Sequence, residues 1–236
     1  MDSPARHLQM AIRKIALLSR SFDGSAESIN IIQSIVNNFD SRIFQRLIPG
    51  RISRVIQTLR KETSGIRYAD VYQDDYCHVN TFGLLKSGLK IPLHDHPNQH
   101  AVMKVYQGSV KIRSFSIIDC DESDDDDEGG GAASSSSASP VRVRYEGEIV
   151  LSSGSEQQHS AVLGPRNGNI HEVTSLEPHT YFCDFFIANS PNCNYYRVDE
   201  SSEPLVAGKS AILNRIRCPS DFYCDIMDFP SFEKFD

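Results

Sequence analysis

The sequence predicts an all-β core, either a sandwich or a barrel, that follows a short N-terminal helical segment. Three observations lead to this fold class. The apolar period changes from helical to two at about Ile66, many short strand-like runs come after it, and Gly, Pro, Ser or Asn separate these runs. No helical pattern lies between the strands to make a parallel sheet. A chain of 236 residues suits one domain with appendages.

Helical spacing marks the first part of the chain. Three stretches place apolar residues on one helix face: Leu8, Ile12, Ile15 and Leu18; Ile32, Ile35, Val36 and Phe39; Ile52, Val55, Ile56 and Leu59. Asp40 is a candidate cap for a turn that Pro49-Gly50 ends. We predict that residues 1–62 form a helical segment packed on a barrel of residues 63–236.

The predicted strands carry apolar residues at alternate positions. They are RYADVYQ, NTFGLLKS, HAVMKVYQG, SVKIRSFSI, PVRVRYEGEIVLS, HSAVLG, HEVTS, HTYFCDFFIA and NYYRVDE. One segment interrupts them, the acidic and Ser/Gly-rich stretch 119–140. Its composition cannot bury enough apolar surface to offset the entropy lost on ordering, so we predict a disordered loop between two strands. A phosphorylation target is an alternative to the favoured interpretation, a tolerated surface insertion.

Charge and cysteine content narrow the function classes. The net charge is -7, yet residues 1–61 carry ten Lys and Arg against four Asp and Glu. Because no aromatic-basic interleaving accompanies this basic segment, a solvated helix face is favoured over a nucleic-acid site. No apolar run approaches the roughly 18 residues of a membrane span. Six dispersed cysteines without a CxxC pair indicate reduced thiols, and we expect the cytoplasm, with the nucleus as an alternative and mitochondria less favoured.

The segment HDHPNQH, from His94 to His100, suggests a metal site. In a strand, His94 and His96 project to the same side while Asp95 points to the other, where it could pair with a basic group or orient a loop. Two imidazoles on one side of a strand make half of a metal site. A satisfied core or surface histidine is the competing interpretation of each.

A third ligand has to come from elsewhere in the chain. His171 follows a Gly/Pro/Asn turn and begins a strand in GPRNGNIHEV. His159 and His179 are competitors that lack this turn-into-strand context. Spacing alone leaves the choice open.

Two motifs resemble those of the cupin superfamily, small β-barrels of the double-stranded β-helix or jelly-roll type that hold a metal in their mouth. GLKIPLHDH has a glycine six residues before His94 and is followed by Gly108, and GNIH has a glycine three residues before His171. Many cupins have a glutamate ligand soon after HxH, where this chain has PNQHA. The resemblance therefore implies a three-histidine site.

Residues 66–228, apart from the acidic insert, are similar to the thiol dioxygenases of the cysteamine (2-aminoethanethiol) dioxygenase and plant cysteine oxidase family. The similarity is carried by the HDHP block and by NIHEVTSLEPHTYFCDFFIA, NCNYYRV and DFYCD, in that order. It implies that His94, His96 and His171 hold Fe(II), with O₂ as co-substrate. The implied reaction adds both oxygen atoms to the sulfur of cysteamine, or of the N-terminal cysteine of a protein, and gives a sulfinic acid.

The resemblance also assigns residues around the metal. Asp184 matches an acidic residue important for substrate handling, and a turn-capping aspartate is the alternative. Cys193 and Tyr195 match a pair that can form a thioether cross-link in animal relatives, against the alternative of a strand packed into the core. His100 is either a hydrogen-bond partner of a ligand or a polar residue at the barrel rim.

Two other functions compete with the thiol dioxygenase. One is a non-catalytic metal-binding cupin that binds a ligand or regulates a partner, although such a module does not need all three histidines and Asp184. The other is a different cupin enzyme, such as a metal-dependent isomerase or a quercetinase-like oxygenase, which would usually keep the missing glutamate. An N-terminal-cysteine substrate would make the enzyme an oxygen sensor that marks proteins for degradation. We expect a monomer.

Overall fold

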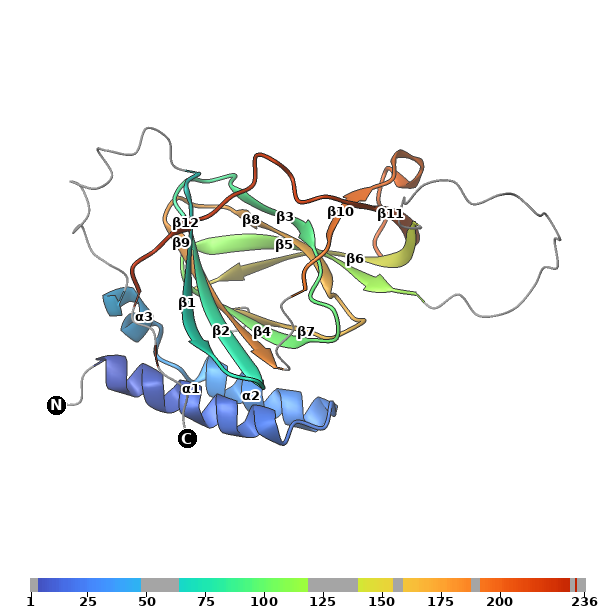
Figure 1. Ribbon diagram of the computed structural model, residues 1–236. Helices are drawn as coiled ribbons and strands as arrows, with labels where there is room; N and C mark the ends of the chain where they lie inside the picture. The colour runs from blue at the N-terminus through green and yellow to red at the C-terminus, as the bar shows by residue number, and fades with distance from the viewer. Residues whose placement is uncertain are drawn as a thin grey trace.

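The computed structural model describes residues 4–47, 64–118, 140–154, 159–187, 192–229 and 232 (Figure 1). The predicted helix at 52–59 lies outside these ranges, as does the acidic insert apart from Pro140. Within the described ranges, three helices precede the strands: α1 (Pro4–Arg20), α2 (Ala26–Asn37) and α3 (Ser41–Leu47). Among the described residues, no helix has both the length and the apolar character needed to cross a bilayer.

Twelve strands within the described ranges confirm the predicted all-β core. They are β1 (Ile66–Gln73), β2 (Cys77–Leu84), β3 (Lys90–His94), β4 (His100–Gln107), β5 (Ser109–Ile117), β6 (Val141–Ser152), β7 (Ser160–Leu163), β8 (Ile170–Ser175), β9 (Thr180–Ile187), β10 (Tyr195–Val198), β11 (Ser210–Ile216) and β12 (Asp225–Ile226). The runs named from the sequence omit β3, β11 and β12, although β3 lies in the strand-like GLKIPLHDH.

The strands form two sets. A six-stranded sheet has the order β12-β1-β2-β9-β4-β7, and the order β10-β11-β6-β5-β8-β3 closes on itself. A single residue pair, Tyr195 with His94, joins β10 to β3 and completes this ring. In β3, Pro92 lies two residues before His94. Because proline has no backbone N–H, it cannot donate a hydrogen bond that would extend the ladder beyond this pair.

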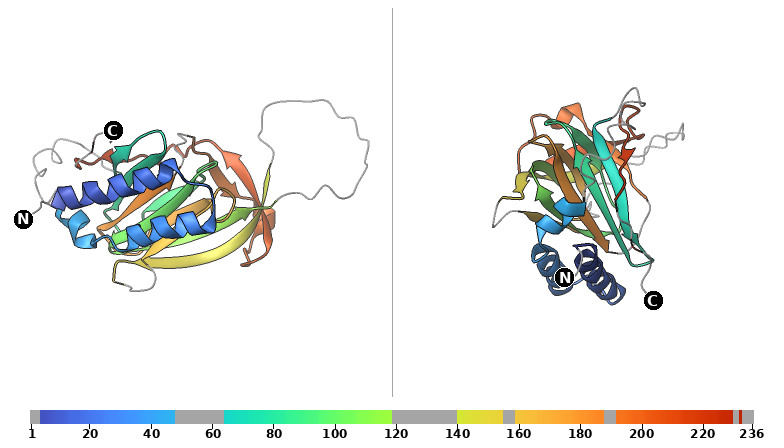
Figure 2. Two further views of the ribbon diagram at one scale, coloured as in Figure 1. Left: turned by 90° about the horizontal axis from the view of Figure 1, so that it is seen from below. Right: turned by 90° about the vertical axis from the view of Figure 1, so that its left-hand side faces the viewer.

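The helices cover the outer face of the six-stranded sheet (Figures 1 and 2). Leu8, Ile12 and Ile15 of α1 are buried against it, as the sequence predicts, while Leu18 is half-buried. The ring of Phe44 in α3 stacks on Tyr106 of β4 with centroids 4.6 Å apart. The predicted cap is also in place, because Asp40 Oδ1 accepts the Arg42 N–H at 2.9 Å at the start of α3.

Lys104 connects the sheet to the helices from a buried position. Its Nζ donates to the backbone carbonyls of Val36 (2.8 Å), Asn37 (3.0 Å) and Phe39 (2.7 Å). Val36 and Asn37 end α2 and Phe39 lies two residues beyond it, where the helix runs out of N–H groups, although Val36 also accepts the Phe39 N–H at 3.2 Å. A strand lysine therefore serves as the C-terminal cap of a helix far away in the sequence, and burial lowers its pKa to about 8.

Strand β9 is buried along its whole length and separates two apolar layers. Tyr181, Cys183, Phe185 and Ile187 face the helices. Phe182 belongs instead to a second cluster, with Ile91 of β3 and Val173 of β8. Because side chains alternate along a strand, Asp184 and Phe186 share the Phe182 face and point toward the interior between the two strand sets. This face of β9 forms one wall of the candidate site.

Candidate metal centre

The structure brings together His94, His96 and His171. His94 ends β3, His171 lies in β8, and the two are directly paired across the ladder. One ligand-capable atom from each of the three side chains lies within 4.8 Å of those of the other two. The Nε2 atoms of His94 and His96 are 3.0 Å apart. This is the only cluster of at least three candidate ligand side chains found within the part of the chain that the structure describes.

Backbone carbonyls set the orientation of two of these rings. His94 Nδ1 lies 2.8 Å from the Pro92 carbonyl, and His171 Nδ1 lies 2.8 Å from the Asn169 carbonyl. A carbonyl only accepts, so each Nδ1 carries the proton and the Nε2 lone pair is free to bind a cation. Burial lowers the pKa of all three imidazoles, to about 3 for His171, which keeps them neutral as metal ligands require.

The separation of His94 and His96 fits two ligands of one metal ion. Two ligands at right angles and metal–nitrogen bonds of about 2.1 Å would place their nitrogens about 3.0 Å apart, which matches the separation of His94 and His96. No carboxylate belongs to the cluster. Three neutral ligands leave the full charge of a divalent ion for an anionic substrate to offset.

His96 reaches the site in a different way from the one predicted. Strand β3 ends at His94, with a register shift before it, so His94 and His96 are not alternate residues of one strand. Asn169 holds the turn instead: its Oδ1 accepts the His96 N–H at 2.7 Å, and its Nδ2 donates to the carbonyls of His96 (3.0 Å) and Gly164 (2.9 Å). No expectation from the sequence covered this role, although Asn169 stands within the GNIH motif.

Asp95 orients a loop, one of the alternatives drawn from the sequence. Its carboxylate accepts the N–H of Asn194 at 2.8 Å, the side-chain amide of Asn194 at 3.0 Å and the hydroxyl of Tyr196 at 2.7 Å. These bonds fix the segment that leads into β10. They therefore hold Tyr195 beside His94, with ring centroids 6.4 Å apart.

Cys193 and Tyr195 lie close enough to interact, and a third residue joins them. The phenol of Tyr195 has hydrogen-bond contacts with both Cys193 and Cys218, and its ring packs on Phe222 at 6.1 Å. Cys193 and Cys218 are both exposed and free. Cys218 was missed because its approach to Tyr195 depends on where the chain runs after β11, which no local pattern encodes.

His100, His159 and His179 lie outside the cluster. His100 packs its ring edge against Phe22 of the helical segment, with centroids 4.8 Å apart. Backbone carbonyls pair with the Nδ1 atoms of His94 and His171, so His100 is not the hydrogen-bond partner of these two Nδ1 atoms. His179 adopts a positive φ of 56° in the turn before β9. His159 precedes β7, and its carbonyl accepts the Val105 N–H. Neither of the two competitors for the third position belongs to the cluster.

Asp184 lies within β9 and does not cap a turn. It is paired with Asn80 of β2 on one side and Met103 of β4 on the other. Phe186, two residues further on the same face, packs on the His96 ring at 4.5 Å, so Asp184 is on the wall next to the histidines. Burial raises the pKa of Asp184 to about 7.

The raised pKa leads to a testable effect on stability. Between about pH 4 and 7 the folded chain holds a proton on Asp184 that the unfolded chain releases, so stability falls as pH rises. Asp184→Asn removes the free-energy cost of ionising this carboxyl group in the folded chain. Urea unfolding of the metal-free protein should show the variant up to about 4 kcal/mol more stable than the wild type at pH 8.5, with a much smaller difference at pH 4.5.

The exposed Asp221 supplies a matched control for this measurement. Asp221→Asn should change the free energy of unfolding by no more than about 0.5 kcal/mol at pH 8.5, as is usual for an exposed side chain. An Asp184→Asn variant that is less stable than the wild type at pH 8.5 would contradict our account of the buried carboxyl.

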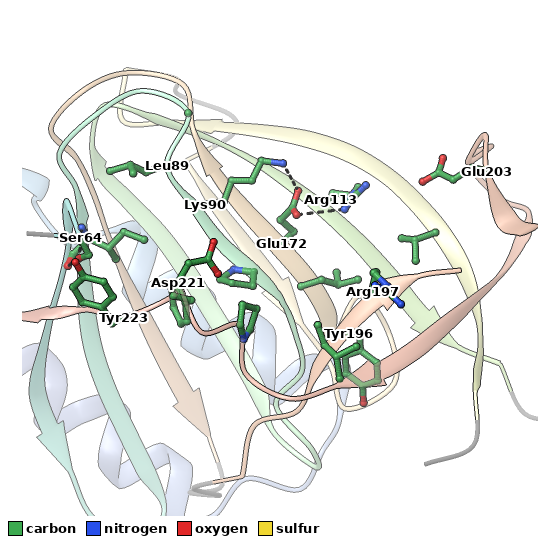
Figure 3. Close-up of a pocket in the computed structure, with 18 residues that line it drawn as sticks. Ser64, Leu89, Lys90, Arg113, Glu172, Tyr196, Arg197, Glu203, Asp221 and Tyr223 are labelled. Carbon is green, nitrogen blue, oxygen red and sulfur yellow. Dashed lines mark hydrogen bonds and ion pairs between the residues drawn. The ribbon is translucent and has the colours of Figure 1, made fainter. Parts of the chain in front are cut away.

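A separate pocket of about 630 Å³ lies on the outer side of the β3-β8-β5 wall (Figure 3). Lys90 and Arg113 converge there on Glu172, with nitrogen–oxygen distances of 3.4 and 3.3 Å. The stretch from Pro219 to Tyr223 forms its far side. The pocket is lined by none of the six candidate site residues, because Glu172 faces outward from the strand whose His171 faces inward.

The chain is similar to known proteins over most of its length. The chain is 29% identical to the 2-aminoethanethiol dioxygenase of Homo sapiens over 198 residues, which cover 76% of this chain and 72% of that protein. It is 29% identical to the 2-aminoethanethiol dioxygenase of Mus musculus over 189 residues, covering 74% and 73%. The model of the family PCO_ADO matches residues 36–231.

The solved structures that match are more distant. KdgF from Halomonas sp. is 16% identical, with a TM-score of 0.36, and covers 56% of this chain and 86% of that chain. A cupin superfamily protein from Desulfitobacterium hafniense is 10% identical, with a TM-score of 0.33, and covers 61% and 96%. On the family match, the chain belongs to the PCO_ADO family and is an oxidoreductase of the dioxygenase kind.

Proposed function

We propose that this enzyme is an iron-dependent thiol dioxygenase that adds both atoms of O₂ to a thiol sulfur and forms a sulfinic acid. The observation that carries the proposal is the convergence of three neutral imidazoles, with no carboxylate among them, beside a buried Asp184. The family membership agrees with it, because the matched relatives are named for a dioxygenase that acts on 2-aminoethanethiol.

Different residues of the site would hold the metal, bind the amine of the substrate and border its sulfur. His94, His96 and His171 would hold Fe(II), which supplies the redox chemistry when it is bound. Asp184, on the wall that β9 forms, would hold the ammonium of the substrate. Tyr195, next to His94, would border the reacting sulfur, with Cys193 beside it as the candidate cross-linking partner.

We infer that the substrate is an aminothiol, either cysteamine itself or the N-terminal cysteine of a protein. Both place a free amine two carbons from a thiol, which suits a cationic group near Asp184 and a sulfur at the metal. With a protein substrate, the rate would follow oxygen supply and the sulfinic acid would mark the protein for degradation. We propose that the enzyme acts as a monomer in the cytoplasm or nucleus.

The test is an oxygen-uptake assay on protein loaded anaerobically with Fe(II). Cysteamine and a peptide that begins with cysteine are supplied separately, and mass spectrometry follows the products. We expect a gain of two oxygen atoms on at least one thiol and no such gain with His96→Ala. Absence of uptake with either thiol, in folded protein that contains stoichiometric iron, would overturn the proposal and favour a binding module.

A further inference from the structure

Asn80 is a buried amide on the wall that faces the candidate metal centre. It is 5% exposed and lies directly across the ladder from Asp184. On the same face of β2, the neighbouring pairs are His78 with Phe186 and Phe82 with Phe182. Since Phe186 packs on His96 at 4.5 Å, the Asn80–Asp184 pair is one same-face step, about 7 Å along the strand, from a residue in contact with the cluster.

A chain of hydrogen bonds fixes the orientation of this amide. Asn80 contacts the phenol oxygen of Tyr68, and the phenol in turn donates to Asp70. His78 Nε2 also contacts Asp70 Oδ1, at 2.8 Å. Because the phenol proton is committed to Asp70, the Tyr68 oxygen accepts from the amide, so Asn80 uses its Nδ2 there. The Oδ1 atom is thereby turned away from Tyr68.

The Oδ1 atom of Asn80 is a buried acceptor that receives no hydrogen bond from any residue within the described ranges. Buried polar atoms of this kind are uncommon in folded proteins, since they lose water without gaining a partner. The neighbouring Asp184 is a second buried acceptor on the same face. Two acceptors side by side suit a ligand with several N–H donors and a positive charge.

We propose that Asn80 Oδ1 binds the free ammonium of the substrate together with Asp184, and that Tyr68 positions the amide for this contact. The inference rests on the proposed function and deepens it. It names Asn80 as a residue that makes the enzyme select thiols with an unmodified primary amine. Acetylated N-terminal cysteines would be rejected, because acetylation removes the charge and two of the three donors.

This arrangement would discriminate strongly between thiols with and without an amine, because a thiol without an amine leaves buried acceptors of the site unpaired. An analogue without the amine leaves both Asn80 Oδ1 and Asp184 buried without a donor, which binding sites penalise far more than a missing methylene. The pair 1-propanethiol and cysteamine isolates the effect, since a methyl group replaces the ammonium at nearly the same size.

The first readout is thiol binding to the protein loaded with Co(II) in place of iron, under anaerobic conditions. The absorption band of a thiolate bound to cobalt gives Kd for cysteamine and for 1-propanethiol. Asn80→Leu should weaken cysteamine binding at least about tenfold, the cost of one lost charge-assisted hydrogen bond. It should leave 1-propanethiol binding unchanged or tighter, because the variant no longer buries an unpaired oxygen against the methyl group. Tyr68→Phe should weaken cysteamine binding by a smaller factor, since the amide is no longer held in one orientation.

The second readout is steady-state turnover of the iron-loaded enzyme. Asn80→Leu should raise KM for cysteamine far more than it lowers kcat. Met103→Leu is the matched control, because Met103 is the other cross-strand neighbour of Asp184 and is apolar. It should leave the preference for cysteamine over 1-propanethiol within twofold of the wild-type value.

The possible outcomes separate this inference from the proposed function. If Asn80→Leu weakens both thiols equally, or neither, while the wild type prefers cysteamine, the role of Asn80 is overturned and the dioxygenase proposal stands. If the folded, metal-loaded wild type binds and oxidises neither thiol, both are overturned. Leucine at position 80 would lie on the same face of β2 as the apolar Phe82, so the variant is expected to fold, and its thermal unfolding would be measured alongside.

Discussion

Replacing His171 by alanine is expected to abolish stable metal binding and, with it, thiol oxidation. The three imidazoles converge within 4.8 Å, and removal of one leaves two ligands from a single turn. Loss of a residue that merely supports a metal ligand commonly costs 10- to 100-fold in affinity or activity, and loss of a ligand itself should cost more. We expect metal content after gel filtration to fall below about a tenth of the wild-type value, and activity to fall more than about 100-fold.

His100→Gln is the control for this experiment, because it changes another histidine of the same HDHPNQH segment. His100 packs on Phe22 and is not part of the cluster. The variant should keep its metal and its activity within about twofold. Retention of stoichiometric metal by His171→Ala would mean that the cluster is not the metal centre, and loss of metal in both variants would point to a general effect on folding.

Replacing Lys104 by methionine is expected to destabilise the protein by about 3–5 kcal/mol and to release the helical layer. Methionine keeps the apolar part of the side chain but removes the Lys104 donor from three carbonyls, of which that of Val36 keeps a backbone donor, the Phe39 N–H at 3.2 Å. Each buried group that loses its partner costs about 1–3 kcal/mol. Thermal unfolding should shift down by roughly 10 °C, as expected for a chain of this size.

Limited proteolysis would show where the damage lies. In Lys104→Met, cleavage should accelerate within residues 20–41, because α2 is no longer held to β4. Lys90→Met provides the control, since the Lys90 side chain is 57% exposed and forms one ion pair with Glu172. It should change stability by no more than about 0.5 kcal/mol. Equal stability of Lys104→Met and the wild type would contradict the capping role.

The sequence predicts the fold class well because local periodicity carries much of it. The stripe of Leu8, Ile12 and Ile15 and the alternation within β9 identify which side chains are buried. They do not identify what covers them. Lys104 illustrates the limit: a lysine in a strand normally faces solvent, yet this one is 3% exposed because α2 lies over it. Only the packing of the helices on the sheet decides its environment.

The candidate site was predictable only in part for a related reason. Strand pairing is non-local, and the pattern along a strand does not state which strand lies beside it. The pairing of His94 with His171 selects His171 over His159 and His179, and it could not be read from spacing. The resemblance supplied that choice. The pairing of Asn80 with Asp184 joins positions more than 100 residues apart, and neither periodicity nor the resemblance indicated it.

The closure of the ring through Tyr195 and His94 sets an order of events during synthesis. His94 and His96 leave the ribosome well before His171, which follows His96 by 75 residues. At about 5–20 residues per second, this interval lasts roughly 4–15 s, and β10 is made later still. A nascent chain thus presents two of the three histidines with no wall around them. Binding of the proposed metal by all three histidines would therefore have to wait until β8 has been made and has paired with β3.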